Sequence, residues 1–169
     1  KMEDIFSDSF DKIKKNFSEV FAELFDGGKG KLDLDIEYGQ SVLDAGIIIE
    51  AEPPGKKLQN IDLLSGGERA LTAIAIIFSI IKLNPVPFCI LDEVDAPLDE
   101  SNSVVYAKFL RKFRRNTQFV IVSHRKPTME LANEIYGITM QEKGVSKLFS
   151  VKLSEALKIA ETVKNAVNE

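Results

Sequence analysis

The feature that most constrains the fold is a long apolar segment that follows a Gly-Gly pair. The segment "LLSGGERALTAIAIIFSIIK" runs from Leu63 to Lys82, and its apolar residues fall on every side of a helix. This pattern predicts a buried helix that begins at Ser65 and ends at Asn84-Pro85. Such a helix needs a core around it, and 169 residues are enough to form one in a single ordinary domain.

Composition and charge exclude several classes of protein. Hydrophobic residues make up 44% and charged residues 28% of the chain, as in soluble globular domains. The net charge of −4 argues against a protein that binds nucleic acid over its whole surface. The longest apolar run, Ala70 to Ile81, is shorter than the roughly 20 residues that cross a bilayer. The single cysteine, Cys89, suits a reduced thiol, and with no signal peptide we expect a cytoplasmic protein.

Hydrophobic periodicity predicts an order of elements typical of an α/β protein. Apolar residues three and four apart predict a first helix, which Gly27-Gly28 ends. Helices are expected at about 4–25, 65–83, 99–115 and 126–133, and strands at 32–36, 46–52, 88–91, 119–122, 135–140 and 145–153, the last two as a hairpin. The apolar run 88–91 predicts a strand covered on both faces. The polar tail from Ser154 to Glu169 is expected to be helical.

The Gly-Gly pair allows two interpretations. Ser65 and Glu68 form a capping-box pattern, so the simpler one is an ordinary helix start. That does not explain the two glycines, which let a backbone approach a ligand closely at a helix N-terminus, where anions bind. The pair would then contact a phosphate, although the chain contains no phosphate-loop sequence G-x-x-x-x-G-K-[ST].

Two acids follow the apolar strand in "FCILDEVDAPLD". Adjacent residues at a strand end point to opposite sides, so one of the Asp92 and Glu93 carboxylates could face a Mg²⁺ ion while the other activates a water for attack on a phosphate. The alternative is a pair of solvated acids in a turn before a helix entry at Asp99. His124 follows the next apolar strand, so we expect it at the same edge of the sheet, although a lone histidine is more often structural.

The basic run from Arg111 to Arg115 also has two interpretations. It could contact DNA phosphates. Basic residues at a helix C-terminus also complement the helix dipole, and we favour that interpretation because the chain is acidic overall.

Four motifs, in this order, resemble those of ABC-type ATPases. Leu64-Ser65-Gly66-Gly67-Glu68 resembles their signature motif, Phe88 to Glu93 their Walker B strand, Val94 to Asp99 their D-loop, and His124 their switch histidine. The flanking text, such as "VPFCILDEVDAPLDESN", is similar to the C-terminal half of the head domain of structural maintenance of chromosomes (SMC) proteins, most of all the bacterial form. The resemblance covers about Phe6 to Leu153, and four ordered motifs are far more specific than one.

The resemblance implies a fold and an organisation. The fold would be α/β, the C-terminal lobe of an ABC-type ATPase head, with a mostly parallel sheet flanked by helices. Residues 1–26 would form the base of a coiled coil and 27–153 the lobe, which ends in a β-hairpin. Residues 154–169 would be a polar tail of the same single domain.

The resemblance also implies an activity and its residues. Two engaged heads would bind ATP between them and hydrolyse it to drive chromosome condensation and segregation. The signature residues Leu64, Ser65, Gly66, Gly67 and Glu68 would contact ATP held by the partner head, with Asp95 and Asp99 in the D-loop. Asp92 would bind Mg²⁺, and Glu93 and His124 would be catalytic. The chain alone would be inactive, because the phosphate loop and the glutamine loop are absent.

Partners follow from the same resemblance. They are the N-terminal lobe of the same head, a second SMC head in a homodimer, the winged-helix domain of a kleisin subunit, and DNA through the assembled, nucleoid-associated complex, with no membrane. The rival enzymes are a coiled-coil ABC ATPase of DNA repair and a transporter nucleotide-binding domain, which should carry its own phosphate loop. A non-catalytic docking fragment is the third alternative, and the presence of Glu93 argues against it.

Overall fold

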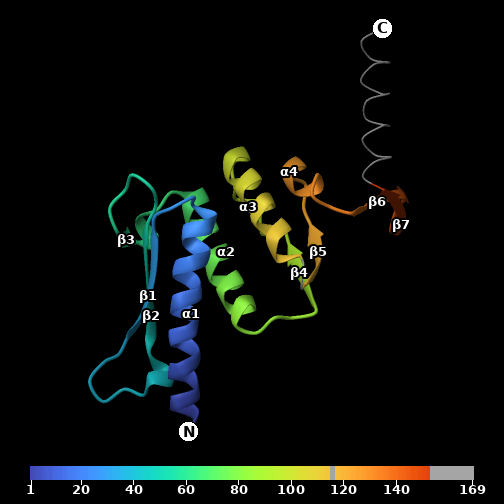
Figure 1. Cartoon of the computed structure of the whole chain (residues 1–169). Helices are drawn as coiled ribbons and strands as arrows, with labels where there is room; N and C mark the ends of the chain where they lie inside the picture. The colour runs from blue at the N-terminus through green and yellow to red at the C-terminus, as the bar shows by residue number, and fades with distance from the viewer. Residues whose placement is uncertain (115–116, 153–169) are drawn as a thin grey trace.

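A computed structural model describes residues 1–114 and 117–152 of the chain. This part contains four α-helices and seven strands, and all but the short strand at Gln59–Asn60 follow the order that hydrophobic periodicity predicts. Figure 1 shows how they are arranged in space. The helices are α1 (Met2–Leu24), α2 (Gly66–Leu83), α3 (Glu100–Phe113) and α4 (Lys126–Met129), with 3₁₀ turns at Val42–Asp44 and Ile61–Leu63. The predicted helical tail, 154–169, lies outside the described residues.

The strands form three small sheets. They are β1 (Lys29–Asp35), β2 (Gly46–Glu52), β3 (Gln59–Asn60), β4 (Phe88–Asp92), β5 (Gln118–Val122), β6 (Glu134–Glu142) and β7 (Val145–Lys152). The first three pair antiparallel in the order β1-β2-β3, β4 pairs parallel with β5, and β6 pairs antiparallel with β7. The prediction of a mostly parallel sheet is therefore wrong for the described residues, because only β4 and β5 are joined by a helical crossover.

Helix α1 packs its apolar stripe against α2 and the β1–β2 pair. Phe17 and Phe21 are fully buried on this stripe. They can approach the sheet because the two residues paired beneath them, Gly30 and Ala51, are small. A Cβ atom built on Gly30 would lie 2.7 Å from Phe17 Cε1 and 2.8 Å from Phe21 Cβ. The absence of a side chain at position 30 therefore sets how closely α1 lies on the sheet.

Helix α2 is less buried than its sequence predicts. Its bounds agree with the prediction, with Ser65 as N-cap and Asn84 as C-cap. The expectation of burial on all sides is wrong, because Ile77 and Ile80 are 40% and 47% exposed. The buried face includes Ser79, whose hydroxyl donates a hydrogen bond to a backbone carbonyl one turn earlier. A buried hydroxyl on this face is tolerated because its hydrogen bond is local.

Aromatic rings join α2, α3 and β5 into one core. Phe78 of α2 lies at the centre, and its ring centroid is 5.0 Å from that of Phe109, 4.9 Å from Phe113 and 5.9 Å from Phe119. Aromatic pairs at these separations add stabilisation beyond the area they bury. The cluster fixes α3 against the inner face of the β4–β5 pair.

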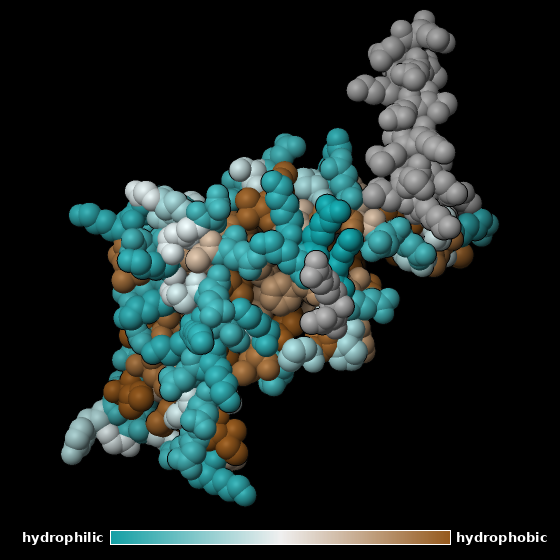
Figure 2. Space-filling view, in the orientation of Figure 1, coloured by the Kyte–Doolittle hydropathy of each residue, from teal (hydrophilic) through white to brown (hydrophobic). Residues whose placement is uncertain are grey.

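The outer face of the β4–β5 pair is exposed, which corrects the prediction of a strand covered on both faces. Phe88 and Ile90 of β4 are 61% and 65% exposed, and Val120 and Val122 of β5 are 51% and 50% exposed. Parallel pairing sets Ile90 beside Val120 on this face. Other apolar side chains also reach the surface, as the brown areas among polar residues in Figure 2 show.

Helix α4 is shorter than predicted and is followed by the β6–β7 pair. It ends at Met129 rather than near Asn133, because the chain then tightens into i→i+3 turns: Leu131 N–H donates to Thr128 O and Ala132 N–H to Met129 O. Strands β6 and β7 lie on either side of a turn at Gly144. Among the helices in the described part, none combines the length and apolar character needed to cross a membrane.

We expect Gly30→Ala to lower the free energy of unfolding by about 1–3 kcal/mol, because the new methyl group overpacks the Phe17–Phe21 contact. Urea denaturation followed by circular dichroism measures the change. Gly46→Ala on the same strand pair is the matched control, since its Cβ would lie no closer than 3.4 Å to a neighbour. Equal stability of the two variants would contradict this account of the helix–sheet packing.

Candidate functional site

The carboxyl ends of β4 and β5 bring the predicted catalytic residues to one edge. Asp92 pairs with Val122 in the parallel register, and Glu93 N–H donates a hydrogen bond to Val122 O at 2.9 Å. His124 follows Val122 by two residues, so it leaves the sheet at the same edge. Asp92, Glu93 and His124 are all exposed to solvent. The expectation that His124 shares an edge with the two acids is confirmed.

Asp92 and Glu93 have different surroundings. Alternation along β4 places Asp92 on the same exposed face as Phe88 and Ile90. Glu93 has φ = 47°, a left-handed conformation that is uncommon for a residue with a side chain. Such strain persists only where the surrounding structure imposes it, and it is concentrated at functional sites. Glu93 lies one residue beyond the end of β4, so the prediction that the two carboxylates point in different directions stays a prediction.

His124 lies beside a small hollow at the start of α3. The hollow has a volume of about 240 Å³ and is lined by Glu100, Ser103, His124, Arg125, Lys126 and Pro127. These residues come from the start of α3 and from the loop that leads from β5 into α4. The imidazole is thus held at the rim of an open polar hollow rather than in the core, as a contact to an incoming ligand requires.

The signature turn, residues 64–68, forms the start of α2 and contains the predicted capping box. The Glu68 carboxylate accepts hydrogen bonds from Ser65 N–H at 3.1 Å and Ser65 Oγ at 2.7 Å, and it forms an ion pair with Lys56. Partial burial alone would raise the pKa of Glu68, but the hydrogen bonds from Lys56 and Ser65 outweigh it and lower that pKa. The Glu68 carboxylate therefore stabilises the turn itself. Leu64 is 5% exposed, so its side chain anchors the turn in the core.

The two glycines of the turn differ in what a side chain at each position would contact. A Cβ atom on Gly67 would lie 2.9 Å from Asn102 Nδ2 and 3.8 Å from Asp99 Oδ2, so this glycine lets the turn pack on the start of α3. A Cβ atom on Gly66 would meet no atom within 4 Å, and its φ is not positive. Neither internal packing nor backbone conformation requires glycine at position 66, which leaves close approach of an external group as the physical reason for it.

Asp99 caps α3 and contacts the signature turn from the other side. Its Oδ1 accepts a hydrogen bond from Asn102 N–H at 2.7 Å, and its backbone oxygen accepts one from Ser103 Oγ at 2.7 Å. The helix entry that the sequence suggests as an alternative role for Asp99 is therefore present. Because Asp99 and Asn102 lie beside Gly67, the D-loop and the signature turn share one surface.

Asp95, the other D-loop acid, is turned inward. It is 1% exposed, and its Oδ2 accepts hydrogen bonds from Ser123 Oγ at 2.6 Å and Thr128 Oγ1 at 2.5 Å. Arg125 Nη2 donates to Ala96 O at 2.6 Å. These contacts tie the D-loop to the loop that carries His124. The sequence alone did not single out the residues that donate these hydrogen bonds to the D-loop, although Ser123 and Arg125 directly flank the predicted histidine.

Three buried polar atoms lie in and around these contacts between the D-loop and the His124 loop. Asp95 Oδ1, Tyr106 Oη and Arg125 Nε have no hydrogen-bond partner within the described ranges 1–114 and 117–152. Burial, and to a smaller extent the neighbouring Asp95 carboxylate, raises the pKa of Tyr106 well above its usual range. The Tyr106 phenol is therefore neutral at physiological pH.

Metal binding would depend on Asp92 together with ligands from outside the described residues. No cluster of three or more His, Cys, Asp or Glu side chains in that part of the chain could hold a metal ion. One exposed carboxylate at a strand end still fits Mg²⁺, because this ion keeps several waters and often takes its other ligands from substrate phosphates.

Comparisons with known proteins agree with the motifs. Residues 9–147 match the family described as the RecF/RecN/SMC N terminal domain. Chromosome partition protein Smc of Bacillus subtilis is 56% identical over 150 residues, and that of Clostridium kluyveri is 54% identical over 153 residues. These alignments cover 89% and 90% of this chain but only 12% and 13% of the two relatives.

Solved structures match as well. A chain described under ATP-driven dimerization and DNA-stimulated activation of SMC ATPases aligns with a TM-score of 0.83 and 38% identity, covering 96% of this chain and 97% of the solved one. The Smc head domain of Pyrococcus furiosus, solved with an extended coiled coil and bound to the C-terminal domain of ScpA, aligns with a TM-score of 0.77 and 39% identity. The alignment covers 96% of this chain and 40% of the solved chain. The chain therefore belongs to the RecF/RecN/SMC family and has the structure of part of an SMC head.

Proposed function

We propose that this chain is the C-terminal half of the ATPase head of a bacterial-type SMC protein. With the N-terminal half it would bind and hydrolyse ATP between two engaged heads and so drive chromosome condensation and segregation. The observation that carries the proposal is the open backbone at Gly66, on a signature turn that has no phosphate loop of its own to serve. A helix N-terminus with a free approach suits the phosphate of ATP held by another head.

The exposed outer face of β4 and β5 supports the proposal that another lobe of the head covers it. Phe88, Ile90, Val120 and Val122 are each at least half exposed on two adjacent strands. An apolar sheet face is normally covered by another layer of the same domain, because burying it supplies folding energy. The N-terminal half of the head is the occupant that we propose, and Asp92 lies on the same face. Covering this face would bring the phosphate loop of that lobe toward the Asp92 carboxylate.

Roles at the carboxyl edge follow from this arrangement. When Mg²⁺ is bound, it would neutralise phosphate charge, and Asp92 would be its protein ligand. Glu93 would orient the attacking water and accept its proton, and its strained backbone would hold the carboxylate away from the metal side. His124, exposed beside the hollow, would donate a hydrogen bond toward the phosphate.

The partner head would meet a separate surface of this chain. Ser65, Gly66 and Gly67 present backbone N–H groups at the start of α2, next to Asp99 and Asn102. ATP would then join two heads, with one contributing the carboxyl edge and the other the signature turn. Because the D-loop lies beside the signature turn and is tied to the His124 loop, it would link the surface that meets the partner to the catalytic edge.

Further partners come from the relatives. Related Smc heads have been solved bound to the C-terminal winged-helix domain of ScpA, so we infer that a kleisin subunit binds this chain too. DNA would be bound through the assembled complex, and a cytoplasmic, nucleoid-associated location remains our prediction.

The ATPase rate tests the proposed function. We expect no hydrolysis by this chain alone, because it lacks a phosphate loop. When the N-terminal half of the same head is added, the rate should rise more steeply than linearly with head concentration, since two heads form each site. Glu93→Gln is the control: it should preserve ATP-driven pairing, measured by sedimentation, but slow hydrolysis more than about tenfold. Activity of the chain alone, or unchanged turnover of Glu93→Gln, would contradict the proposal.

A substitution in the signature turn tests the contact with the partner head. We expect Ser65→Arg to abolish ATP-dependent pairing of completed heads, because a long cationic side chain would fill the open approach at Gly66. ATP bound in the head's own pocket should be retained, as measured with a fluorescent nucleotide. Ser18→Arg, at an exposed position on α1 away from the signature turn, is a matched control for the added side chain. Normal pairing of Ser65→Arg would exclude the role of the turn in trans.

The tie at Asp95 can be tested independently of nucleotide. We expect Asp95→Ala to lower the free energy of unfolding by about 1–3 kcal/mol, because it leaves the buried Thr128 hydroxyl and the half-buried Ser123 hydroxyl without their acceptor. Asp95→Asn keeps an acceptor oxygen and should lose less. Urea denaturation gives both values, and a larger loss for Asn than for Ala would show that the hydroxyls do not depend on this oxygen.

A further inference from the structure

The loop between β2 and β3 places a lysine beside the signature turn. Its sequence is Pro53-Pro54-Gly55-Lys56, and Lys56 N–H donates a hydrogen bond to Pro53 O at 3.0 Å, which closes a four-residue β-turn. Gly55 has φ = 79°, as the third position of a type II turn requires, and proline at the second position fixes its own φ. The backbone that carries Lys56 is therefore held by the sequence of this turn.

Lys56 contacts both oxygens of the Glu68 carboxylate. Its Nζ lies 2.8 Å from Glu68 Oε1 and 2.9 Å from Glu68 Oε2. Glu68 Oε2 also accepts hydrogen bonds from Ser65 N–H at 3.1 Å and from Ser65 Oγ at 2.7 Å. One carboxylate oxygen in the first turn of α2 therefore accepts from three donors, next to the open approach at Gly66.

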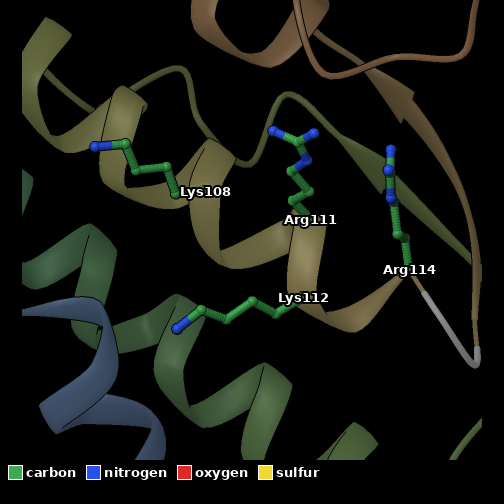
Figure 3. Close-up of a pocket in the computed structure, with 4 residues that line it drawn as sticks. All are labelled: Lys108, Arg111, Lys112 and Arg114. Atoms are coloured by element: carbon green, nitrogen blue, oxygen red, sulfur yellow. The ribbon is translucent and has the colours of Figure 1, made fainter.

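The cations at the end of α3 are held differently. They line an open hollow of about 700 Å³ (Figure 3) and are Lys108, Arg111, Lys112 and Arg114. Arg111 and Lys112 lie in the last turn of the helix, where the helix dipole favours positive charge, as the sequence predicts. Lys112 extends toward α1 and pairs with Glu23, and these side chains are 64% and 39% exposed. Glu68 is only 18% exposed, so solvent screens its pair with Lys56 less.

The negative charge of Glu68 opposes the contact that the signature turn is proposed to make. A carboxylate in the first turn of a helix suits the helix dipole, but a phosphate that approaches Gly66 would meet it as a like charge. The ammonium group of Lys56 offsets this repulsion, because the Lys56–Glu68 pair carries no net charge. The simpler role of Lys56 is to stabilise the turn, although partly exposed ion pairs usually contribute little to stability.

The Ser65 hydroxyl must change its partner before it can bind a phosphate. A hydroxyl group has one hydrogen, and Ser65 donates it to Glu68 Oε2. When the hydroxyl turns toward a phosphate, that oxygen keeps two donors, Ser65 N–H and the Lys56 ammonium group. Lys56 thus lets the hydroxyl leave without a half-buried carboxylate oxygen losing most of its hydrogen bonds.

We propose that Lys56 is a positioning residue for the contact between the signature turn and the ATP held by the partner head. Its ammonium group neutralises Glu68 and retains that carboxylate in place when the Ser65 hydroxyl turns to the γ-phosphate. Lys56 acts through Glu68, so it need not touch the nucleotide itself. This role rests on the proposed function, since it requires the signature turn to bind ATP in trans.

ATP-dependent pairing of completed heads, measured by sedimentation, tests this role. We expect Lys56→Gln to weaken pairing by roughly tenfold or more, because the Glu68 charge is then no longer neutralised beside the phosphate. The loss should diminish between about 50 and about 500 mM salt, which screens the repulsion. Lys57→Gln removes the same charge from the next, exposed residue and should pair like the unsubstituted head. Binding of a fluorescent nucleotide in the head's own pocket should not change in either variant.

Two further variants separate a positioning role from a purely structural one. Glu68→Gln removes the repulsive charge together with the ion pair, so adding it to Lys56→Gln should restore pairing to within about threefold of the unsubstituted head. Lys56→Arg keeps the positive charge and should pair normally. If the ion pair only stabilised the turn, the double variant would pair as weakly as Lys56→Gln, and that result would overturn the proposed role.

The outcomes distinguish the role of Lys56 from the proposed function. Normal pairing of Lys56→Gln, in heads whose pairing Ser65→Arg abolishes, would overturn the role of Lys56 and leave the proposed function standing. Equal losses in Lys56→Gln and Lys57→Gln would overturn it in favour of a general effect of surface charge. Unsubstituted heads that do not pair with ATP would refute the proposed function and the role of Lys56 with it. Thermal melting of each variant shows whether a loss of pairing reflects a loss of folding.

Discussion

The parallel pairing of β4 with β5 is the interaction on which the candidate site depends. It sets Asp92 beside Val122 and extends one residue further, through the hydrogen bond from Glu93 N–H to Val122 O. Glu93 has a left-handed conformation at this point, where the chain enters the D-loop. A shift of one residue in this register would move Asp92 to the other face and separate it from His124. The aromatic cluster around Phe78 stabilises the pair from its inner face.

Helix α3 connects the parts of the molecule that the proposed function requires to act together. At its start, Asp99 caps the helix and Asn102 packs against Gly67 of the signature turn. In its middle, Tyr106 lies by the buried Asp95, which is bound to the His124 loop. At its end lie four exposed cations, Lys108, Arg111, Lys112 and Arg114. A rigid helix with these contacts would transmit a displacement at any one of them to the others, since packed cores deform little.

Local signals in the sequence predicted the ends of α2 well. Helix α2 has Ser65 as its N-cap and Asn84 as its C-cap, as predicted, because capping and the proline after Asn84 act over a few residues. The shared edge of the acids and His124 followed from the βαβ order alone. The tie from Asp95 to Ser123 and Thr128 joins residues 28 and 33 positions apart, and no local pattern encodes such a contact. Hydrophobicity indicated that both faces of β4 are apolar but could not show that only one is covered.

The uncovered apolar face and the strand end that carries Asp92 belong to one continuous surface. The outward side chains of β4 run from Phe88 through Ile90 to Asp92, so an apolar row ends in the carboxylate proposed to bind Mg²⁺. A lobe that buries the row must also surround Asp92, and lowering the local dielectric there strengthens the attraction between the carboxylate and a cation. The same contact that completes the hydrophobic layer would therefore complete the metal site. In the proposed head, division between these two layers would make nucleotide binding depend on assembly of the fold itself.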